Sequence, residues 1–456
     1  MGDIQKTLEN HRKYHAAGHT MDVRFRIKQL NLLHHGIVQY EDKILSALHQ
    51  DLKKSKYEGY LTELGIVRDE IRYVARKLPK WARPKRVKTP FYHWPAASRI
   101  YPEPYGVALI IAPWNYPFQL TLAPLVAAIA AGNCAVLKPS EYSPATSDVI
   151  KEMIETYFES NFISVVTGGV DTSSALLAEA FDYIFYTGSS RVGKIVMAKA
   201  AEHLTPVTLE LGGKSPCIVT PDAKLELAAK RIASGKFINA GQTCIAPDYL
   251  MVHRSVEEEL IRYIKNYIEQ FYGPDPKNSP DYPKIINRAH FDRLTALMDN
   301  ATILAGGESD PDRLYIAPTL LSGVDWTHPV MQAEIFGPIL PVMPYENLDE
   351  AVTAVNRQSK PLALYLFSRR NSVIDKIISE IPFGGGTIND TLIHIATPHL
   401  PFGGVGASGM GSYHGKAGFD TFTHYKSIMK RPFKFDTPFR YPPYSDKMTL
   451  IKTVLR

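Results

Sequence analysis

The spacing of hydrophobic residues changes twice along the chain. From about Ile4 to Leu78, apolar residues recur at helical spacing, which predicts a series of amphipathic helices. Residues 81–104 then carry five prolines, which disfavour helix and central strand alike and predict an extended excursion or an edge hairpin. From residue 107, short β-rich runs alternate with helical patterns, so the rest of the chain reads as a different kind of structure.

The alternating region predicts an α/β fold with a doubly wound parallel sheet covered on both faces. A second alternating series begins near Val207, includes a helical pattern at 225–238 and ends near Asn389. The first series predicts strands at 107–112, 134–138, 163–167 and 183–187, and helices at 120–131, 147–158, 174–179 and 192–203.

These patterns divide the chain into two α/β units and an arm. We expect one unit from residues 1–80 and 105–208, and a second from 209–395. Residues 81–104 and 396–456 would form a bridging arm and C-terminal segment. A length of 456 residues is consistent with roughly three units at about 150 residues each.

Composition and charge exclude several classes of protein. A net charge of +6 with no run of five like charges does not indicate a nucleic-acid partner. The N-terminus lacks an apolar signal segment, and the C-terminus lacks a hydrophobic anchor. The apolar stretch 120–137 contains Pro124, Gly132 and Asn133, so it reads as a helix, a turn and a strand. We therefore expect a soluble cytoplasmic protein without a membrane anchor.

The three cysteines differ in their surroundings. An odd number without a Cys-x-x-Cys pair disfavours a disulfide framework or a zinc site, and no metal is expected. Cys134 and Cys217 lie in apolar strand-like runs, which is typical of core residues. Cys244 lies in a Gly-Gln-Thr-Cys turn after a helix, and Glu210 precedes a glycine pair. Cys244 and Glu210 are therefore the candidate nucleophile and base.

Two glycine motifs resemble nucleotide sites. Residues 404–409 fit Gly-x-Gly-x-x-Gly but follow no strand, so we interpret them as a loop. Residues 188–194 approach a Walker A loop, but Ile195 stands where Ser or Thr must hold magnesium. This second segment follows a strand and opens a helix, so its amides can face an anion, although a plain strand–helix turn fits as well.

Together with Pro-Trp-Asn-Tyr-Pro at 113–117 and Glu-Ile-Phe-Gly-Pro at 334–338, these segments resemble the NAD(P)-dependent aldehyde dehydrogenases. The resemblance implies oxidation of an aldehyde to a carboxylic acid. Cys244 would attack the carbonyl, and Asn115 and the Cys244 amide would hold the oxyanion. Glu210 would activate the water that hydrolyses the thioester.

The resemblance also implies a cofactor site. Lys138 and Glu141 would contact the adenosine ribose, and Glu334 the nicotinamide ribose. Because the Glu141 carboxylate can accept hydrogen bonds from a ribose 2′-hydroxyl but repels a 2′-phosphate, we expect NAD to be preferred and NADP tolerated. The complete set of expected cofactor contacts is Trp114, Lys138, Glu141, Gly188, Ser189, Gly193, Leu211, Glu334 and Phe336.

Within the family, Gly-Ser-Tyr-His-Gly at 411–415 and Arg-Tyr-Pro-Pro-Tyr at 440–444 resemble class 3 enzymes, which are generally dimeric and act on fatty and aromatic aldehydes. We expect a homodimer built through 81–104 and 425–444. Ser234 stands where relatives place a tryptophan, which predicts an altered substrate tunnel and a preference for medium-chain or aromatic aldehydes. The expected pocket residues are Tyr116, Ser234 and Ile238.

Two other functions remain open at this point. A CoA-acylating enzyme would pass the thioester to a thiol, but family members of that type usually lack the carboxylate that Glu210 supplies. A catalytically silent relative would not need Cys244, Glu210 and Asn115 together.

Overall fold

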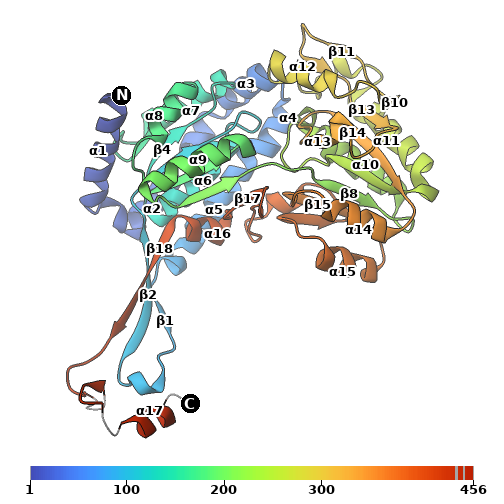
Figure 1. Cartoon of the computed structure of the whole chain (residues 1–456). Coiled ribbons are helices and arrows are strands. Elements are labelled where there is room, and N and C mark those ends of the chain that lie inside the picture. Colours follow the sequence, from blue (N-terminus) through green and yellow to red (C-terminus); the bar gives the residue numbers. More distant parts are fainter. Residues whose placement is uncertain (1, 437–439, 445–446, 455–456) are drawn as a thin grey trace.

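The chain folds into two α/β lobes and a projecting arm (Figure 1). A computed structural model describes residues 2–436, 440–444 and 447–454. One lobe is built on a six-stranded sheet and the other on a seven-stranded sheet. A three-stranded sheet forms the arm (Figure 1).

The N-terminal quarter forms the predicted amphipathic helices. Their apolar stripes, including Leu30, Ile37 and Ile44, are fully buried. The helices at 23–39, 41–52 and 65–81 pack against α6 (Gln119–Ala131) and α7 (Pro144–Tyr157) of the first lobe. The helices are α1 (Gly2–Ala16), α2 (Val23–Gln39), α3 (Glu41–Leu52), α4 (Lys56–Gly59), the π-helix η2 (Tyr60–Leu64) and α5 (Gly65–Trp81).

The six-stranded sheet has the order β17-β7-β6-β3-β4-β5 and is parallel except for β17. The predicted parallel sheet and its helices are confirmed, with small changes in element ends. α9 begins at Ser190, two residues before the expected start. The elements are β3 (Val107–Ile111), α6 (Gln119–Ala131), β4 (Cys134–Lys138), α7 (Pro144–Tyr157), β5 (Ile163–Val165), α8 (Val170–Leu177), β6 (Tyr183–Thr187), α9 (Ser190–His203), β7 (Val207–Glu210) and β17 (Gly409–Met410).

The seven-stranded sheet has the order β10-β13-β14-β9-β8-β15-β16, and only β10 runs antiparallel to its neighbour. A separate β-ladder joins β11 (Ser309–Asp310) to β12 (Tyr315–Ile316). The remaining elements are β8 (Pro216–Val219), α10 (Leu225–Phe237), η4 (Ile238–Gly241), β9 (Tyr249–His253), α11 (Glu257–Tyr272), α12 (Arg288–Ala296), β10 (Thr302–Ala305), β13 (Thr319–Ser322), α13 (Pro329–Gln332), β14 (Ile339–Tyr345), α14 (Leu348–Asn356), β15 (Ala363–Phe367), α15 (Asn371–Glu380) and β16 (Gly385–Ile388).

The arm corrects one expectation. β1 (Lys85–Val87) and β18 (Thr423–Lys430) flank β2 (Ala97–Pro104), so a proline-bearing segment forms the central strand. The reason lies in the register: β1 pairs only with 98–100, whereas Pro102 and Pro104 lie beyond that stretch and pair with β18 alone. These prolines therefore face no strand on one side, as on a true edge.

The last segments connect the arm to the lobes. α16 (Gly415–Thr421) packs against α5 and α6, and α17 (Met448–Val454) lies at the arm tip (Figure 1). The expected arm segment 425–444 includes residues 437–439, which lie outside the described residues. In the part of the chain that the structure describes, no helix is long and apolar enough to cross a bilayer.

Candidate active site

The nucleophile loop is shaped by three consecutive left-handed residues. Asn239, Ala240 and Gly241 have φ values of 52°, 50° and 70°. A β-carbon on Gly241 would lie 2.3 Å from the carbonyl oxygen of Gly337, so only glycine fits there. The turn leads to Cys244, in the loop between η4 and β9, where its side chain is only partly buried, whereas Cys134 and Cys217 are fully buried in β4 and β8.

The Cys244 thiol lies in an environment that disfavours the thiolate. Burial raises its pKa well above the usual value, and the nearby charges of Glu334 and Glu210 raise it further. The backbone N–H groups of Cys244 and Ile245 face the sulfur and act in the opposite direction. The resting side chain is therefore a neutral thiol with two amide donors beside it.

Glu210 ends β7, and its position is fixed by the strands on both sides. Its backbone oxygen accepts from Gly188 N at 2.9 Å, and Gly409 of β17 pairs with it. The side chain is 3% exposed, and neither carboxylate oxygen has a hydrogen-bond partner among the described residues. Burial raises the pKa of this carboxyl well above its ordinary value, so its carboxylate form binds a proton more readily than an exposed carboxylate does.

Asn115 follows β3 and reaches across to the nucleophile loop. Its Nδ2 donates to the backbone oxygen of Gln242 at 3.0 Å. Its own backbone oxygen accepts from Asn239 Nδ2 at 2.8 Å. The next residue makes a second bridge, because the Tyr116 hydroxyl lies 2.7 Å from Thr243 Oγ1. The C-terminal edge of the six-stranded sheet therefore meets the loop that leads into the seven-stranded sheet.

The expected ribose-binding segment lies at the end of β4. Lys138 Nζ donates to Glu141 Oε2 at 2.9 Å and to Pro139 O at 3.1 Å. The pair differs from an ordinary surface salt bridge because the lysine side chain is 2% exposed, whereas that of Glu141 is one-third exposed. A carboxylate held in this way keeps its free edge toward solvent, where a hydroxyl group can bind.

Glu334, Trp114 and Phe336 meet at the other end of the expected cofactor site. The rings of Trp114 and Phe336 pack edge to face with centroids 5.4 Å apart. A β-carbon on Gly212 would lie 1.8 Å from Glu334 Oε2, so the carboxylate fills the space that this glycine leaves. Glu334 Oε1 is buried without a partner among the described residues. Burial, with the Asp248 charge, raises the pKa of Glu334 to about 8.

The glycines in the turn before α9 are required by close packing against neighbouring side chains as well as by any role in binding an anion. Ser189 caps the helix, with Oγ accepting from Val192 N at 3.4 Å. A β-carbon at Gly188 would lie 2.3 Å from the Tyr186 hydroxyl, and one at Gly193 would lie 2.7 Å from Leu211 Cδ2. Because Gly188 N already donates to Glu210 O, this amide is not available to an anion, contrary to the simplest expectation from the motif.

Comparison with known proteins agrees with this geometry. Residues 2–428 match the model of the aldehyde dehydrogenase family. The chain belongs to this family. The 4,4′-diaponeurosporen-aldehyde dehydrogenase of Staphylococcus aureus is 48% identical over the whole of both chains. The dimeric NADP-preferring aldehyde dehydrogenase of Canis lupus familiaris is 45% identical over 98% of this chain and 100% of its own. Aldehyde dehydrogenase family 3 member A2 of Rattus norvegicus is 45% identical over 97% and 92%.

The fold of this aldehyde dehydrogenase is also that of a solved relative. A substrate-bound structure of Staphylococcus aureus AldH superposes with a TM-score of 0.97, at 48% identity and 99% coverage of both chains. The class 3 resemblance and the α/β fold class are thereby confirmed. The protein oxidises aldehydes to carboxylic acids with NAD(P) as hydride acceptor. Neither the CoA-acylating nor the silent alternative gains support from these relatives.

The expected substrate-pocket residues of the aldehyde dehydrogenase lie next to the nucleophile loop. Tyr116 is buried and bonded to Thr243. Ser234 is exposed in the last turn of α10, and its backbone oxygen accepts from Ile238 N. Ile238, half-buried, opens η4 and the turn that leads to Cys244.

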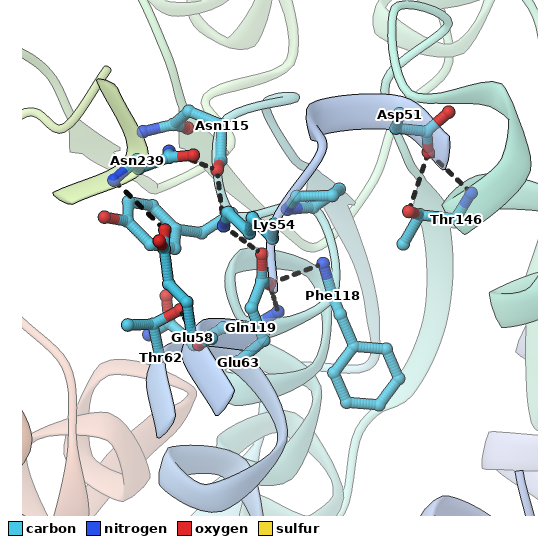
Figure 2. Close-up of polar contacts among 12 residues, drawn as sticks. Asp51, Lys54, Glu58, Thr62, Glu63, Asn115, Phe118, Gln119, Thr146 and Asn239 are labelled. Atoms are coloured by element: carbon cyan, nitrogen blue, oxygen red, sulfur yellow. Dashed lines mark hydrogen bonds and ion pairs between the residues drawn. The ribbon is translucent and has the colours of Figure 1, made fainter. Parts of the chain in front are cut away.

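Sequence analysis missed a buried charged cluster behind Asn115 (Figure 2). Lys54 and Glu63 form an ion pair of 2.6 Å with both side chains fully buried. Lys54 Nζ also donates to Asn115 O at 3.0 Å and lies 3.9 Å from the Tyr116 ring centroid. Glu63 Oε2 accepts from Phe118 N and Gln119 N at 3.1 and 2.9 Å. In sequence, Lys54 and Glu63 fit the polar face of an amphipathic helix, which carries no signal of burial.

Proposed function

We propose that Cys244 is the nucleophile of aldehyde oxidation, Asn115 the side-chain oxyanion donor and Glu210 the base for thioester hydrolysis. The convergence of the Cys244 loop with the ends of β3 and β7 carries this proposal. The thiol gives up its proton to solvent water, and its sulfur forms a bond to the carbonyl carbon as the carbonyl π bond opens toward the oxygen. The oxygen becomes an oxyanion that the Cys244 amide and Asn115 Nδ2 stabilise, because an amide NH₂ retains a second N–H beside its bond to Gln242.

The second half of the reaction uses Glu210. NAD(P), which Trp114, Glu141 and Glu334 would hold, would supply the hydride acceptor, and loss of the hydride from the former carbonyl carbon leaves an acyl thioester on Cys244. Glu210 then takes a proton from water, the oxygen of that water attacks the thioester, and the carboxylic acid leaves as the thiol is restored. Because the Glu210 carboxylate is buried and has no hydrogen-bond partner among the residues that the structure describes, it can accept this proton without breaking an existing hydrogen bond.

The cofactor contacts form part of the same proposal. The unpartnered Glu334 Oε1, the Trp114–Phe336 pair and the half-open Glu141 carboxylate fit a dinucleotide with hydroxyl groups at both ends. Lys138, Ser189 and Leu211 would complete the contacts, with Gly188 and Gly193 allowing close packing. Residues 1–80 and 105–208 would form the dinucleotide-binding domain and 209–395 the catalytic domain, a division supported by the two separate sheets.

We also infer a cytoplasmic homodimer assembled through the arm. Seven of the eight residues of β18 are exposed, among them Tyr425, Ile428 and Met429. An exposed apolar strand needs a covering surface, and the related dog enzyme is dimeric by name. Sedimentation at micromolar concentration tests this assignment, and a monomer would contradict it.

Medium-chain aliphatic and aromatic aldehydes are the proposed substrates. Ser234 leaves the mouth of the nucleophile loop without a large side chain, and the Staphylococcus aureus relative acts, by its name, on a much larger aldehyde than acetaldehyde. Rates with hexanal, benzaldehyde and acetaldehyde test the substrate class, and a clear acetaldehyde preference would contradict it.

The decisive experiment for the reaction itself is Cys244→Ala. NADH formation should be abolished while NAD binding and thermal stability persist, because the thiol supplies a covalent step. Cys217→Ala is the matched control: it should cost stability and leave turnover largely unchanged. Retained activity in Cys244→Ala would remove Cys244 from the mechanism.

A further inference from the structure

Glu58 is a buried carboxylate to which the mechanism above gives no role. It lies in the short helix α4 with 8% of its surface exposed. Its Oε1 accepts from the backbone N–H of Asn239 at 3.0 Å (Figure 2). The Ser55 hydroxyl oxygen accepts from Glu58 N at 3.2 Å and so caps this helix. Glu58 is therefore held from one side by its own helix and holds the nucleophile segment on the other.

Asn239 is the residue through which Glu58 reaches the site. Its φ of 52° is a conformation that residues other than glycine adopt at a cost, although asparagine tolerates it better than most. Its Nδ2 donates to Asn115 O at 2.8 Å and to Gln242 O at 3.1 Å. Gln242 returns two bonds to Asn239 O, from N at 3.1 Å and from Nε2 at 3.0 Å. One side chain thus ties the Asn115 backbone to a residue two positions before Cys244.

We propose that Glu58 is a positioning residue for aldehyde oxidation. Its carboxylate fixes the left-handed turn at Asn239, and that turn sets the Asn115 amide and the Cys244 thiol at their working separation. This inference rests on the proposed roles of Asn115 and Cys244. Among the described residues, Glu58 makes no hydrogen bond to either of these side chains, so its effect passes through the backbone of the turn.

Burial and the charges around Glu58 make its hydrogen bond from the Asn239 N–H sensitive to pH. Burial raises the pKa of Glu58 to about 7, and the charges of Glu63 and Asp281 add to this, against Lys54 and the Asn239 N–H. As pH falls through this range the carboxylate gains a proton, and its bond from Asn239 weakens because the acceptor loses its charge. The titratable groups facing Glu58 are Lys54, Glu63, Tyr116, Tyr272 and Asp281.

The test compares Glu58→Ala with Glu58→Gln in the full-length enzyme. Glu58→Ala removes the acceptor and should lower kcat by roughly 10–100-fold with little change in the KM for NAD, as expected for a small misplacement of reacting groups. Glu58→Gln keeps an acceptor oxygen and should recover most of kcat at pH 8, while losing the rate change near pH 7 that wild type owes to Glu58.

Asp222→Asn provides a matched control. Asp222 also accepts a backbone N–H, from Arg369 at 2.6 Å, but it follows the C-terminal end of β8, whereas the Cys244 loop precedes the N-terminal end of the parallel neighbour β9. This variant should lower the thermal midpoint and leave kcat and its pH profile unchanged. If Asp222→Asn lowered kcat as much as Glu58→Ala does, the effect of Glu58 would be one of stability alone, and the proposal would be overturned.

A second measurement reports the thiol without turnover. Iodoacetamide should alkylate Cys244 selectively, since Cys134 and Cys217 are fully buried, and its rate should change in Glu58→Ala. Asn239→Gly keeps the left-handed backbone but removes the Nδ2 bonds. Adding Glu58→Ala to Asn239→Gly should slow kcat less than Glu58→Ala does alone, because both act through one turn.

Clear outcomes overturn the proposal. An unchanged kcat and alkylation rate in Glu58→Ala, or full additivity with Asn239→Gly, would show that Glu58 does not act through this turn. Where Glu58→Ala does not fold, an unchanged pH profile in Glu58→Gln has the same force. Activity in Cys244→Ala would instead contradict the proposed function, whatever the Glu58 variants show.

Discussion

Glu63 and Glu210 are two buried carboxylates at the same site with opposite surroundings. Glu63, in the N-terminal helical layer, receives Lys54 Nζ on one oxygen and the N–H groups of Phe118 and Gln119 on the other. Glu210, at the end of β7, has no hydrogen-bond partner on either oxygen within the described part of the chain. Burial raises the pKa of both.

This difference in hydrogen bonding distinguishes a structural carboxylate, Glu63, from a candidate catalytic carboxylate, Glu210. A carboxylate whose acceptor positions are filled lowers the energy of one geometry, and it cannot take a proton without losing those bonds. An unpartnered carboxylate gains from any proton or donor that arrives. The Glu63 region therefore holds the Asn115 segment in place, whereas the Glu210 region is left ready to react.

The largest expected effect falls on the unpartnered group. Glu210→Gln should slow deacylation by roughly 10²–10⁴-fold while leaving attack and hydride transfer intact, because only the base is lost. Stopped-flow absorbance should show a burst of NADH near one equivalent per active site followed by a very slow steady state. Mass spectrometry of the quenched enzyme should find the acyl group on Cys244.

Normal steady-state turnover in Glu210→Gln, with no NADH burst and no acyl adduct on Cys244, would contradict the catalytic role that distinguishes Glu210 from Glu63. Added CoA gives a further check. Strong acceleration of the wild type by CoA would reopen the choice of acyl acceptor.

Glu63→Gln should act on stability instead. The substitution leaves the fully buried Lys54 without its charge partner, and breaking a buried pair in this way costs about 3–5 kcal/mol. Urea unfolding followed by tryptophan fluorescence measures the loss. Lys43→Gln is the control, because Lys43 pairs with Glu152 at the surface, where solvent screens the charges, so this variant should change the free energy of unfolding little. Equal effects in the two variants would contradict the structural role of Glu63.

The pH dependence of the rate follows from the raised pKa values. Cys244 acts as a thiolate and Glu210 as a carboxylate, and the pKa of each is raised in the resting enzyme. The reactive forms therefore become more populated as pH rises, so kcat should increase from pH 6 toward pH 9. In Glu210→Gln, the burst rate should keep its rise while the slow steady state loses the part due to Glu210. A falling rate over this range would show that the neutral forms react.

The smallest effect concerns cofactor choice. NAD should be preferred by wild type, and Glu141→Gln should raise the efficiency with NADP relative to NAD by several-fold, a modest change because the carboxylate is one-third exposed and screened. Ratios of kcat/KM measure it, with Glu152→Gln on the exposed face of α7 as the control. A wild-type preference for NADP, as the name of the dog relative describes, would contradict the role given to Glu141.

The spacing of apolar residues predicted the sheets well because strands of a parallel sheet are buried on both faces and therefore consist of continuous apolar runs. The predicted strands at 134–138 and 183–187 coincide with β4 and β6. The family motifs also led to Cys244, Glu210 and Asn115, which the structure brings to facing sheet edges. Their catalytic roles stay predictions until the variants are measured.

The support for those residues could not be read in the same way. Glu58 and Asn239 are 181 positions apart, and a polar residue on a helix looks the same in sequence whether solvent or another domain faces it. The central position of β2 was likewise hidden, because it depends on the short reach of β1. Such features follow from long-range packing, which one sequence does not display.

Residues 211–215 connect the last parallel strand of one lobe to the first strand of the other. Five residues span at most about 18 Å, and this link has no slack: Leu211 N is bonded to Ser408 O, and Gly212 is closed off by Glu334. Glu210 stands at its first end. The separation of the lobes and the position of the Glu210 carboxylate are therefore coupled through this short link. A molecule that forced the lobes apart would move the base away from the thioester without contacting Glu210.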